Sequence, residues 1–499
     1  MRLFYFVFLF LSIIFILTGC HGPSGLQKSH ETSRSLQSQI DYLLSDPAIS
    51  DALVAVYIES LDDGKVVFRQ NEHKLFIPAS NMKLYTTAAA LVNLSPDYRF
   101  RTEFYTNSPV NDGHLEGDLV IKGYGDPAIS GRFFENDILA VFRLWADSLK
   151  SLGIRHIDGN IVGDDSYFSE DFLGKGWNWD DEPFQYSAQT GALSLNNNCV
   201  DISVAPGDSV LHPVKIWIAP DSGYVKIVNR AATISRDSLS SLKIGRERAE
   251  NVIVITGGLP MGSDEVKQAV TIEQPASFFL HSFSKILNEK NILFNGNIET
   301  GVTGVTDSHS LLFSYESPPL IDIINEINKN SNNFYAEQLL RVMGAEFRKK
   351  GSAEKGIDFV NEWVASIGIE PAGLLMYDGS GLSRLNLISP YSTATLLRHM
   401  YYDKNFALFY NSLPVAGVDG TLKKRMKGTA AEGNARAKTG FVSHTRNLAG
   451  YINDSTEKPY LFVIMVNNYH VSTSYVNQLQ DRICVLLSNY HEDIRPHIK

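Results

Sequence analysis

The sequence has few cysteines and no excess of positive charge. Its 499 residues include 3 cysteines, and 45 Lys and Arg residues against 55 Asp and Glu residues give a net charge of −10 at pH 7. These counts exclude a disulfide scaffold and disfavour a nucleic-acid partner. The 13 histidines lack the spacing of metal ligands, so we expect no metal and no other cofactor. The hydrophobic fraction of 44% instead provides cores for about two to four folded units.

The N-terminus begins with an export signal. Arg2 is followed by an apolar run of signal-peptide length that ends at Cys20. The residues LTGC at 17–20 resemble the lipobox of bacterial lipoproteins, in which the cysteine becomes the lipidated first residue. We therefore expect removal of the signal peptide 1–19 and lipidation of Cys20, with an uncleaved membrane anchor as the alternative.

This leader also predicts where the protein resides. Residues 20–33 are polar and rich in turn formers, which favours a tether between the lipid and a folded body on the periplasmic side. His21 stands where an aspartate would retain a lipoprotein at the inner membrane, which favours the outer membrane in a Gram-negative organism. With Cys20 lipidated, Cys199 and Cys484 remain, and we expect two buried free thiols, with a bridge as the alternative.

The patterns at both ends of the remaining chain predict strands of one sheet and helices beside it. Apolar residues recur with a helical period at 34–45 and 475–487. Strand-like runs occur at 52–59, 65–69, 435–441, 447–452 and 460–467.

The middle of the chain has a different pattern. From residue 100 to residue 305 the sequence alternates short strand-like runs with turn formers, which predicts an inserted β-rich region of two subdomains. Helical periodicity returns at 320–364 and 392–410, so we expect a mostly helical lobe there.

Ser80 and Lys83 open an apolar helical run that ends near residue 94. Residues three apart lie on one helix face, so the amine can reach the hydroxyl. A buried lysine loses its proton more readily and can then accept the proton of a serine, which predicts a nucleophile with its own base. The spacing alone is weak evidence, because it recurs at Ser240/Lys243, Ser282/Lys285, Ser352/Lys355 and Ser455/Lys458.

Two further elements distinguish Ser80 from those repeats. Ser331-Asn332-Asn333 precedes a helical run, and Lys438-Thr439-Gly440 lies on a predicted strand. In this order the three elements resemble those of the penicillin-recognising serine acyltransferases. The long first gap, filled by β-rich sequence, is similar to that of the low-molecular-mass class C penicillin-binding proteins, the D-alanyl-D-alanine carboxypeptidase/endopeptidase family. Longer segments carry the same resemblance at 117–119, 125–127, 177–181, 378–384 and 412–422.

The resemblance implies an α/β fold of the penicillin-binding transpeptidase and β-lactamase type. An antiparallel sheet flanked by helices, with a helical lobe, would be formed by residues 34–99 and 306–499. The mainly β region 100–305 would be inserted between these two parts.

The resemblance also implies a mechanism. Ser80 would attack the carbonyl between two terminal D-alanines of a peptidoglycan stem peptide, with Lys83 as the general base, and water would release the acyl-enzyme. Ser331 and Lys438 would relay a proton to the leaving amine, and Asn333 would hold Lys83 and the substrate amide. β-Lactams would acylate the same serine as covalent inhibitors.

Substrate-binding residues are implied in the same way. Thr439 would bind the terminal carboxylate, and the strand through Gly440 would bring the backbone N–H of Phe441 into an oxyanion hole with that of the nucleophile. Relatives commonly have a hydroxyl residue where this chain has Phe441, which leaves the balance of carboxypeptidase and endopeptidase activities open. Asp181 and Arg384 would pair with the amine and carboxylate of diaminopimelate. A solvated loop acid and a structural arginine are the alternative reading of these two residues.

Two other functions are weighed against this one. A class A β-lactamase needs a glutamate that activates the deacylating water, and Glu370-Pro371-Ala372 does not complete that pattern. A lipid-anchored peptidoglycan-binding scaffold would not require the complete proton relay that the motifs provide.

Overall fold

A computed structural model of the chain describes residues 35–169, 171–301 and 305–491. The chain divides into two units, Met1–Ser35 and Leu36–Lys499, and all described helices and strands belong to the second. The predicted signal peptide, Cys20 and the tether lie outside the described residues. Within the described residues, no helix combines the length and the apolar character that a membrane span requires.

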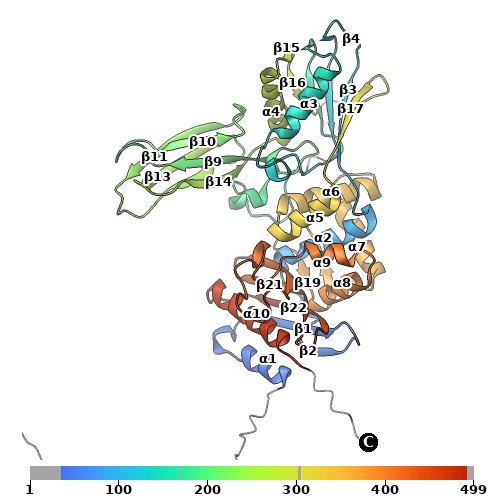
Figure 1. Ribbon diagram of the computed structural model, residues 1–499, viewed down its shortest axis with the longest axis vertical. Helices are drawn as coiled ribbons and strands as arrows, with labels where there is room; N and C mark the ends of the chain where they lie inside the picture. The colour runs from blue at the N-terminus through green and yellow to red at the C-terminus, as the bar shows by residue number, and fades with distance from the viewer. Residues whose placement is uncertain (1–34, 170, 302–304, 492–499) are drawn as a thin grey trace, which may run out of the picture. The chain divides into compact units, whose positions relative to one another are not determined.

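A five-stranded antiparallel sheet joins the two ends of the chain, as the sequence predicts (Figure 1). The strands β1 and β22 pair from Leu53 opposite Asn467 to Ser60 opposite Tyr460. The order is β2-β1-β22-β21-β20, with the bounds Val66–Gln70, Leu53–Ser60, Pro459–Asn467, Thr445–Asn453 and Arg436–Val442.

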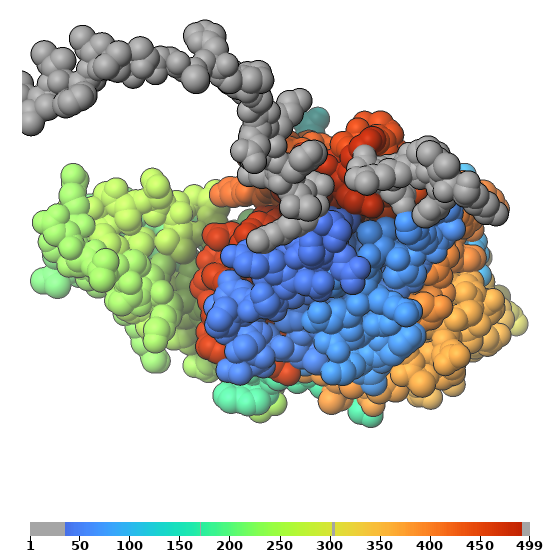
Figure 2. Space-filling model, turned by 90° about the horizontal axis from the view of Figure 1, so that it is seen from below, coloured from blue at the N-terminus to red at the C-terminus, as the bar shows by residue number. Residues whose placement is uncertain are grey.

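Helices cover both faces of this sheet. Because side chains alternate between the two faces along each strand, each strand contributes to two different cores. On one face the core includes helices α1 (Leu36–Leu44) and α10 (Thr473–Ser488), together with Phe462, Ile464 and Val466 of β22. Figure 2 shows the first described segment, in dark blue, beside the segment near the end of the described chain, in red. On the other face, the neighbouring β22 residues Leu461, Val463 and Met465 enter the core of the helical lobe.

The helical lobe forms where helical periodicity is predicted. Helix α2 (Met82–Leu94) lies at its centre, because each residue from Met82 to Leu91 is buried. The surrounding helices are α5 Leu320–Asn330, α6 Asn333–Arg348, α7 Ala353–Ser366, α8 Pro390–Tyr402 and α9 Phe406–Ser412.

The chain between α2 and α5 forms the inserted region, which has a core of its own. Helices α3 (Ala140–Ser151) and α4 (Pro275–Glu289) pack together around an aromatic cluster that includes Phe142, Trp145 and Phe283 (Figure 1). Its five-stranded sheet has the order β16-β8-β6-β3-β17, with the bounds Ile298–Thr300, Ile161–Asp164, Leu119–Gly123, Arg101–Thr106 and Ser310–Glu316.

Smaller sheets complete the inserted region. One has the order β10-β9-β14, with the bounds Lys215–Ala219, Cys199–Ala205 and Val266–Thr271. Another has the order β11-β13-β12, with the bounds Lys226–Ile234, Val252–Pro260 and Lys243–Arg246. A third has the order β15-β7-β5-β4, with the bounds Leu293–Phe294, His156–Ile157, His114–Leu115 and Val110–Asn111.

Strand β17 corrects one predicted boundary. The resemblance implies that all residues from 306 onward belong to the catalytic part, but β17 pairs antiparallel with β3, from Ser310 opposite Thr106 to Glu316 opposite Arg101. The inserted sheet therefore continues to residue 316.

The two described cysteines are both buried and free, as expected. Burial raises the pKa of the Cys484 thiol to about 12 and raises the pKa of the Cys199 thiol further. Neither thiol is therefore a reactive thiolate at neutral pH.

Candidate active site

The candidate nucleophile Ser80 lies in a tight turn, Ala79–Asn81, directly before α2. Ala79 has a left-handed backbone with φ of 46°. Two glycines allow the close approach of neighbouring segments to this turn, because a Cβ at Gly381 would lie 1.8 Å from the Ala79 carbonyl oxygen and one at Gly440 would lie 2.5 Å from that of Pro78. The turn is therefore held between the loop around Gly381 and strand β20.

Lys83 is one helical turn from Ser80 and is fully buried. Its Nζ lies 3.0 Å from Ser80 Oγ, 2.6 Å from Asn333 Oδ1 and 2.7 Å from the carbonyl oxygen of Ser380. Burial lowers the pKa of Lys83 to about 7, partly offset by the charges of Asp378 and Glu337. A neutral amine can donate to the two oxygens of Asn333 and Ser380, which leaves its lone pair to accept the Ser80 proton.

Ser331 and Asn333 lie at the corner between α5 and α6. Ser331 has a left-handed backbone with φ of 58°, which ends α5, and the Asn332 side chain then caps α6 by accepting from the Tyr335 N–H at 3.1 Å. This corner directs Asn333 Oδ1 to Lys83, while Asn333 Nδ2 donates to the Tyr186 carbonyl oxygen at 2.8 Å. One amide thus joins the candidate base to the inserted region.

Lys438 is fully buried on β20 and donates to Ser331 Oγ at 2.9 Å. Burial holds the pKa of Lys438 well below its usual value, and the positive charge of Lys83 lowers this pKa further. The Asn81 side chain donates to the Lys438 carbonyl oxygen at 3.0 Å and so ties β20 to the nucleophile turn. Each buried lysine thus lies within hydrogen-bond distance of one serine hydroxyl, Lys83 of Ser80 and Lys438 of Ser331.

Thr439 and Phe441 follow on the same strand and have different surroundings. Thr439 is buried, and its hydroxyl donates to Thr421 Oγ1 at 2.8 Å. Phe441 is 53% exposed, and the Arg446 guanidinium lies 5.5 Å from its ring centre. The side chain at 441 therefore offers an exposed apolar surface and no hydroxyl.

A buried carboxylate pair supports the loop that contacts Lys83, and sequence reasoning missed its role. Glu337 on α6 accepts from the backbone N–H groups of Gly379 and Ser380 at 3.0 and 2.7 Å. Asp378 accepts from the N–H groups of Gly381 and Ser383 at 2.8 and 2.6 Å. Segment 378–384 carries part of the family resemblance, but no pattern in its sequence predicts that the Ser380 carbonyl oxygen accepts from Lys83.

Asp181 and Arg384 lie on two loops that contact each other. Trp177 Nε1 donates to Asp378 Oδ2 at 2.9 Å, which joins the loop of Asp181 to the loop of Arg384. Asp181 accepts from the Tyr186 hydroxyl at 2.7 Å and from Asn178 Nδ2 at 3.0 Å. Arg384 is exposed, and among the described contacts no hydrogen bond or ion pair joins it to Asp181.

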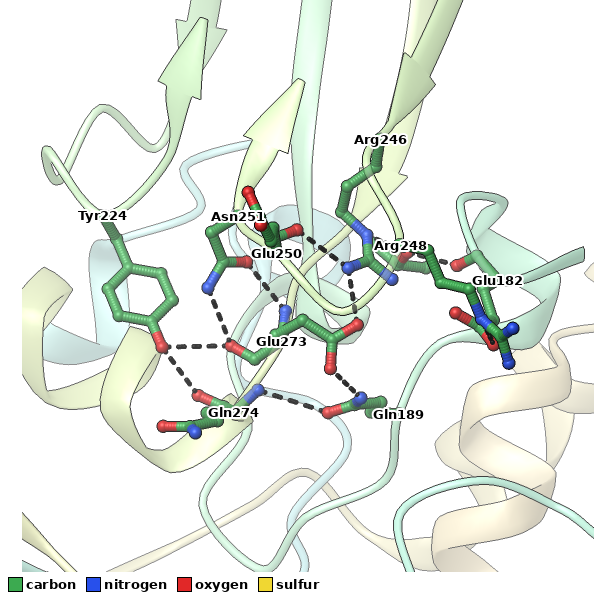
Figure 3. A network of polar contacts seen from close by, with 10 residues as sticks. Glu182, Gln189, Tyr224, Arg246, Arg248, Glu250, Asn251, Glu273 and Gln274 are labelled. Atoms are coloured by element: carbon green, nitrogen blue, oxygen red, sulfur yellow. Dashed lines mark hydrogen bonds and ion pairs between the residues drawn. The ribbon is translucent and has the colours of Figure 1, made fainter. Parts of the chain in front are cut away.

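Polar contacts from the inserted sheets hold the outer side of this region (Figure 3). Glu182 directly follows Asp181 in the chain. Arg248 Nε lies 3.2 Å from Glu182 Oε1, and the hydroxyl of Thr271 donates to the Glu182 carbonyl oxygen. The Gln189 side chain donates to Glu273 Oε2 at 2.5 Å, and the buried Arg246 pairs with the same carboxylate. The segment between Glu182 and Gln189 is therefore held at both ends by residues in and next to strands β12 and β14 of the inserted region.

The fold and this constellation define an active-site-serine acyl enzyme of the penicillin-binding class. Residues 36–490 match the D-Ala-D-Ala carboxypeptidase 3 (S13) family, and the chain belongs to that family. It is a low-molecular-mass class C penicillin-binding protein.

Individual relatives agree with this assignment. The chain is 34% identical over 468 residues to a D-alanyl-D-alanine carboxypeptidase of an Actinomadura species, covering 91% of this chain and 85% of the relative. It is 26% identical over 430 residues to the D-alanyl-D-alanine carboxypeptidase DacB of Haemophilus influenzae, covering 83% and 85%. The crystal structure of penicillin-binding protein 4 from Haemophilus influenzae has the same fold, with a TM-score of 0.79, 24% identity and coverage of 91% and 99%.

Proposed function

We propose that this serine DD-peptidase hydrolyses the bond between the two terminal D-alanines of peptidoglycan stem peptides through an acyl-enzyme on Ser80. The environment of Lys83 is the single observation that carries the assignment of roles. Its buried amine has two oxygen acceptors, Asn333 Oδ1 and the Ser380 carbonyl, and its third contact is with Ser80 Oγ. This arrangement supports a neutral base at the pH of the reaction.

In the acylation step, Ser80 Oγ bonds to the carbonyl carbon of the penultimate D-alanine and its proton passes to Lys83. The carbon–nitrogen bond then breaks, and the leaving amine takes a proton from the Ser331 hydroxyl, which Lys438 contacts at 2.9 Å. The proton that Lys83 took from Ser80 replaces it, so that Lys83 and Ser331 both return to their starting protonation states. Water hydrolyses the ester in the second step, which regenerates Ser80 and releases the shortened peptide. The backbone N–H groups of Ser80 and Phe441 would stabilise the oxyanion in both steps.

Mass spectrometry with benzylpenicillin tests this function. We expect an adduct on Ser80 of the wild-type protein and none on the Ser80→Ala variant. Ser240→Ala is the matched control, because Ser240 begins another Ser-x-x-Lys segment in the inserted region, and it should form the adduct normally.

Hydrolysis of a stem pentapeptide completes the test, with release of D-alanine as the readout. Rapid penicillin turnover without an adduct would identify a β-lactamase. Neither an adduct nor turnover of either compound would favour a peptidoglycan-binding scaffold.

We also propose that the protein is exported and anchored by a lipid on Cys20. The support is the LTGC segment at 17–20 and the polar tether that follows it. Cys20→Ser should abolish incorporation of a labelled fatty acid and move the protein from the membrane to the soluble fraction. Unchanged labelling in this variant would contradict the proposed anchor.

A further inference from the structure

A cavity of about 410 Å³ lies beside strand β2. Residues of β1, β2 and α8 line it, together with the segment that follows β2. Lys438 and Thr439 are on β20, which forms the opposite edge of the same sheet. The cavity is therefore separate from the candidate active site, and its size is that of a ligand-binding site. The proposed mechanism assigns no role to its lining residues.

Arg398 on α8 presents a guanidinium to this cavity. Its Nε and Nη2 donate to the two carboxylate oxygens of Glu59 at 2.6 and 2.5 Å. The Glu59 side chain is 4% exposed, whereas that of Arg398 is 30% exposed. Arg398 Nη1 donates to no group among the described residues. The buried carboxylate thus fixes the guanidinium and leaves the donors of Nη1 open to the cavity.

The acidic groups of the cavity are already paired. Glu59 Oε2 accepts from the Tyr57 hydroxyl at 2.7 Å as well as from Arg398. Burial and the Glu59 carboxylate raise the pKa of Tyr57, so that its hydroxyl keeps the proton it donates. Glu72 Oε1 lies 3.7 Å from Arg69 Nε. Because each carboxylate faces a guanidinium and Arg398 retains free donors, the cavity favours an anion over a cation.

Aromatic rings form another wall of the cavity. Tyr391 begins α8 and is exposed, and the centre of the His73 ring lies 4.9 Å from the centre of its ring. The Tyr391 N–H donates to the Glu72 carbonyl oxygen at 2.9 Å, which holds the start of α8 against this segment. The face of an aromatic ring carries negative charge density, which attracts the C–H groups on the face of a sugar ring. The wall therefore offers a stacking surface beside the open guanidinium.

A guanidinium next to exposed rings suits a carboxylate on a ring-shaped body. Peptidoglycan, the substrate in the proposed function, contains two sugars of almost the same shape. N-acetylmuramic acid carries a lactyl group that ends in a free carboxylate wherever no stem peptide is attached, and N-acetylglucosamine lacks this group. The open donors of Arg398 distinguish between these two sugars.

We propose that this cavity is a second binding site, which takes an acidic sugar of the glycan strand at a position without a stem peptide. The lactyl carboxylate accepts from Arg398 Nη1, and the sugar ring lies against Tyr391 and His73. The choice of this sugar among ring-shaped carboxylates rests on the proposed function, whereas the presence of the site does not. An enzyme that removes stem peptides from the glycan must supply this ligand.

Ligand-observed NMR titration of the full protein with the two free sugars tests the proposal. We expect saturable binding of N-acetylmuramic acid. N-acetylglucosamine should bind about ten-fold more weakly, as expected for the loss of one charge-assisted hydrogen bond. Tyr391→Ala should weaken the binding of both sugars, because it removes the stacking surface and leaves the backbone N–H in place.

A pair of opposite charges at Val66 locates the binding. Val66 lines the cavity and is 38% exposed, so either charge can be placed there without loss of a buried contact. Val66→Glu should weaken the binding of N-acetylmuramic acid by about three- to ten-fold, and Val66→Lys should strengthen it by a similar factor. Arg398→Ala is a poorer probe, because it leaves the buried Glu59 carboxylate unpaired and destabilises the fold.

Leu152→Glu and Leu152→Lys are the matched controls for the variants at Val66. Leu152 directly follows α3, is 43% exposed and does not line the cavity. The same changes of charge at this position should leave the binding of both sugars unchanged.

Each other outcome overturns the proposal. These outcomes are equal binding of the two sugars, no saturable binding of N-acetylmuramic acid, equal binding by Val66→Glu and Val66→Lys, and equal effects at Val66 and Leu152. None of these measurements needs turnover, so their failure leaves the proposed function standing. If the sugar binds as expected but benzylpenicillin forms no adduct, the proposed function fails and the binding site stands.

Discussion

The floor of the active site, formed by Lys83 and Lys438, and its rim, formed by Asp181, Arg384 and Phe441, differ in their exposure to water. On the floor, Lys83 and Lys438 are fully buried, and each has hydrogen-bond partners within the described residues. On the rim, Arg384 and Phe441 are exposed. Burial on the floor lowers the pKa of both lysines, and acid–base catalysis requires this shift. Exposed side chains on the rim remain available to contact a substrate.

The largest expected effect is on the floor. Lys83→Met should reduce the rate of acylation by benzylpenicillin by about 10²–10⁴-fold, because it removes the general base and keeps the apolar stem. Lys83→Arg should not restore the rate, since a guanidinium is not deprotonated in proteins. Stopped-flow or mass-spectrometric acylation rates check this, with Lys285→Met as a control on α4. Substantial activity in Lys83→Arg would show that charge rather than base catalysis is required.

The pH dependence of acylation sharpens the same point. Because burial lowers the pKa of Lys83 to about 7, its neutral form becomes dominant as the pH rises through 7, and the acylation rate should rise with it. The rate should be low below pH 6 and should level off above pH 8, whereas a lysine with an ordinary pKa would give a rise near pH 10. A rate profile that is flat between pH 6 and 8 would rule out Lys83 as the titrating base.

An intermediate effect is expected from the support of the floor. Glu337→Ala leaves the N–H groups of Gly379 and Ser380 without their acceptor, which should lower the free energy of unfolding by about 1–3 kcal/mol. It should also slow acylation about ten-fold, because the Ser380 carbonyl would no longer be held against Lys83. Glu337→Gln retains one acceptor oxygen and should be milder in both respects. Urea denaturation and acylation rates measure the two effects, and equal losses in both variants would assign the requirement to charge.

The smallest effects belong to the rim. Asp181→Asn and Arg384→Gln should each raise KM for stem peptides with a zwitterionic side chain by about three- to ten-fold, the range expected for a single exposed charge-assisted contact. They should leave acylation by benzylpenicillin unchanged, because that compound lacks the side chain. A peptide with an uncharged residue at this position serves as the control. If its KM rises equally, the two residues maintain the loops rather than recognise the side chain.

The sequence predicts the short apolar strands and the residues of ordered motifs, and it does not predict residues that act through backbone groups. Strands such as β1 and β22 were expected to within a residue or so, because they are short, apolar and bounded by turn formers. Ser80, Lys83, Ser331 and Lys438 follow from motifs whose order is specific, and the structure brings them together. Tyr186 and Glu337 could not be found in this way, because the first acts through its backbone carbonyl and the second through loop N–H groups.

The misplaced boundary has a related cause. β17 is a strand by local pattern, but its membership of the inserted sheet depends on pairing with β3, which lies far away in the sequence. Sequence periodicity indicates that a strand exists and carries little information on its partner.

The pairing of β1 with β22 has a consequence for the timing of activity. Ser80 and Lys83 are synthesised early, but Lys438 and the three strands β20, β21 and β22 come from the last part of the chain. Pairing over such a separation is slow to form, since the loop entropy must be lost before the contacts are made. The growing polypeptide therefore contains Ser80 and Lys83 long before it contains Lys438. We expect the acylation activity to appear only after β20, β21 and β22 have joined β1 in one sheet.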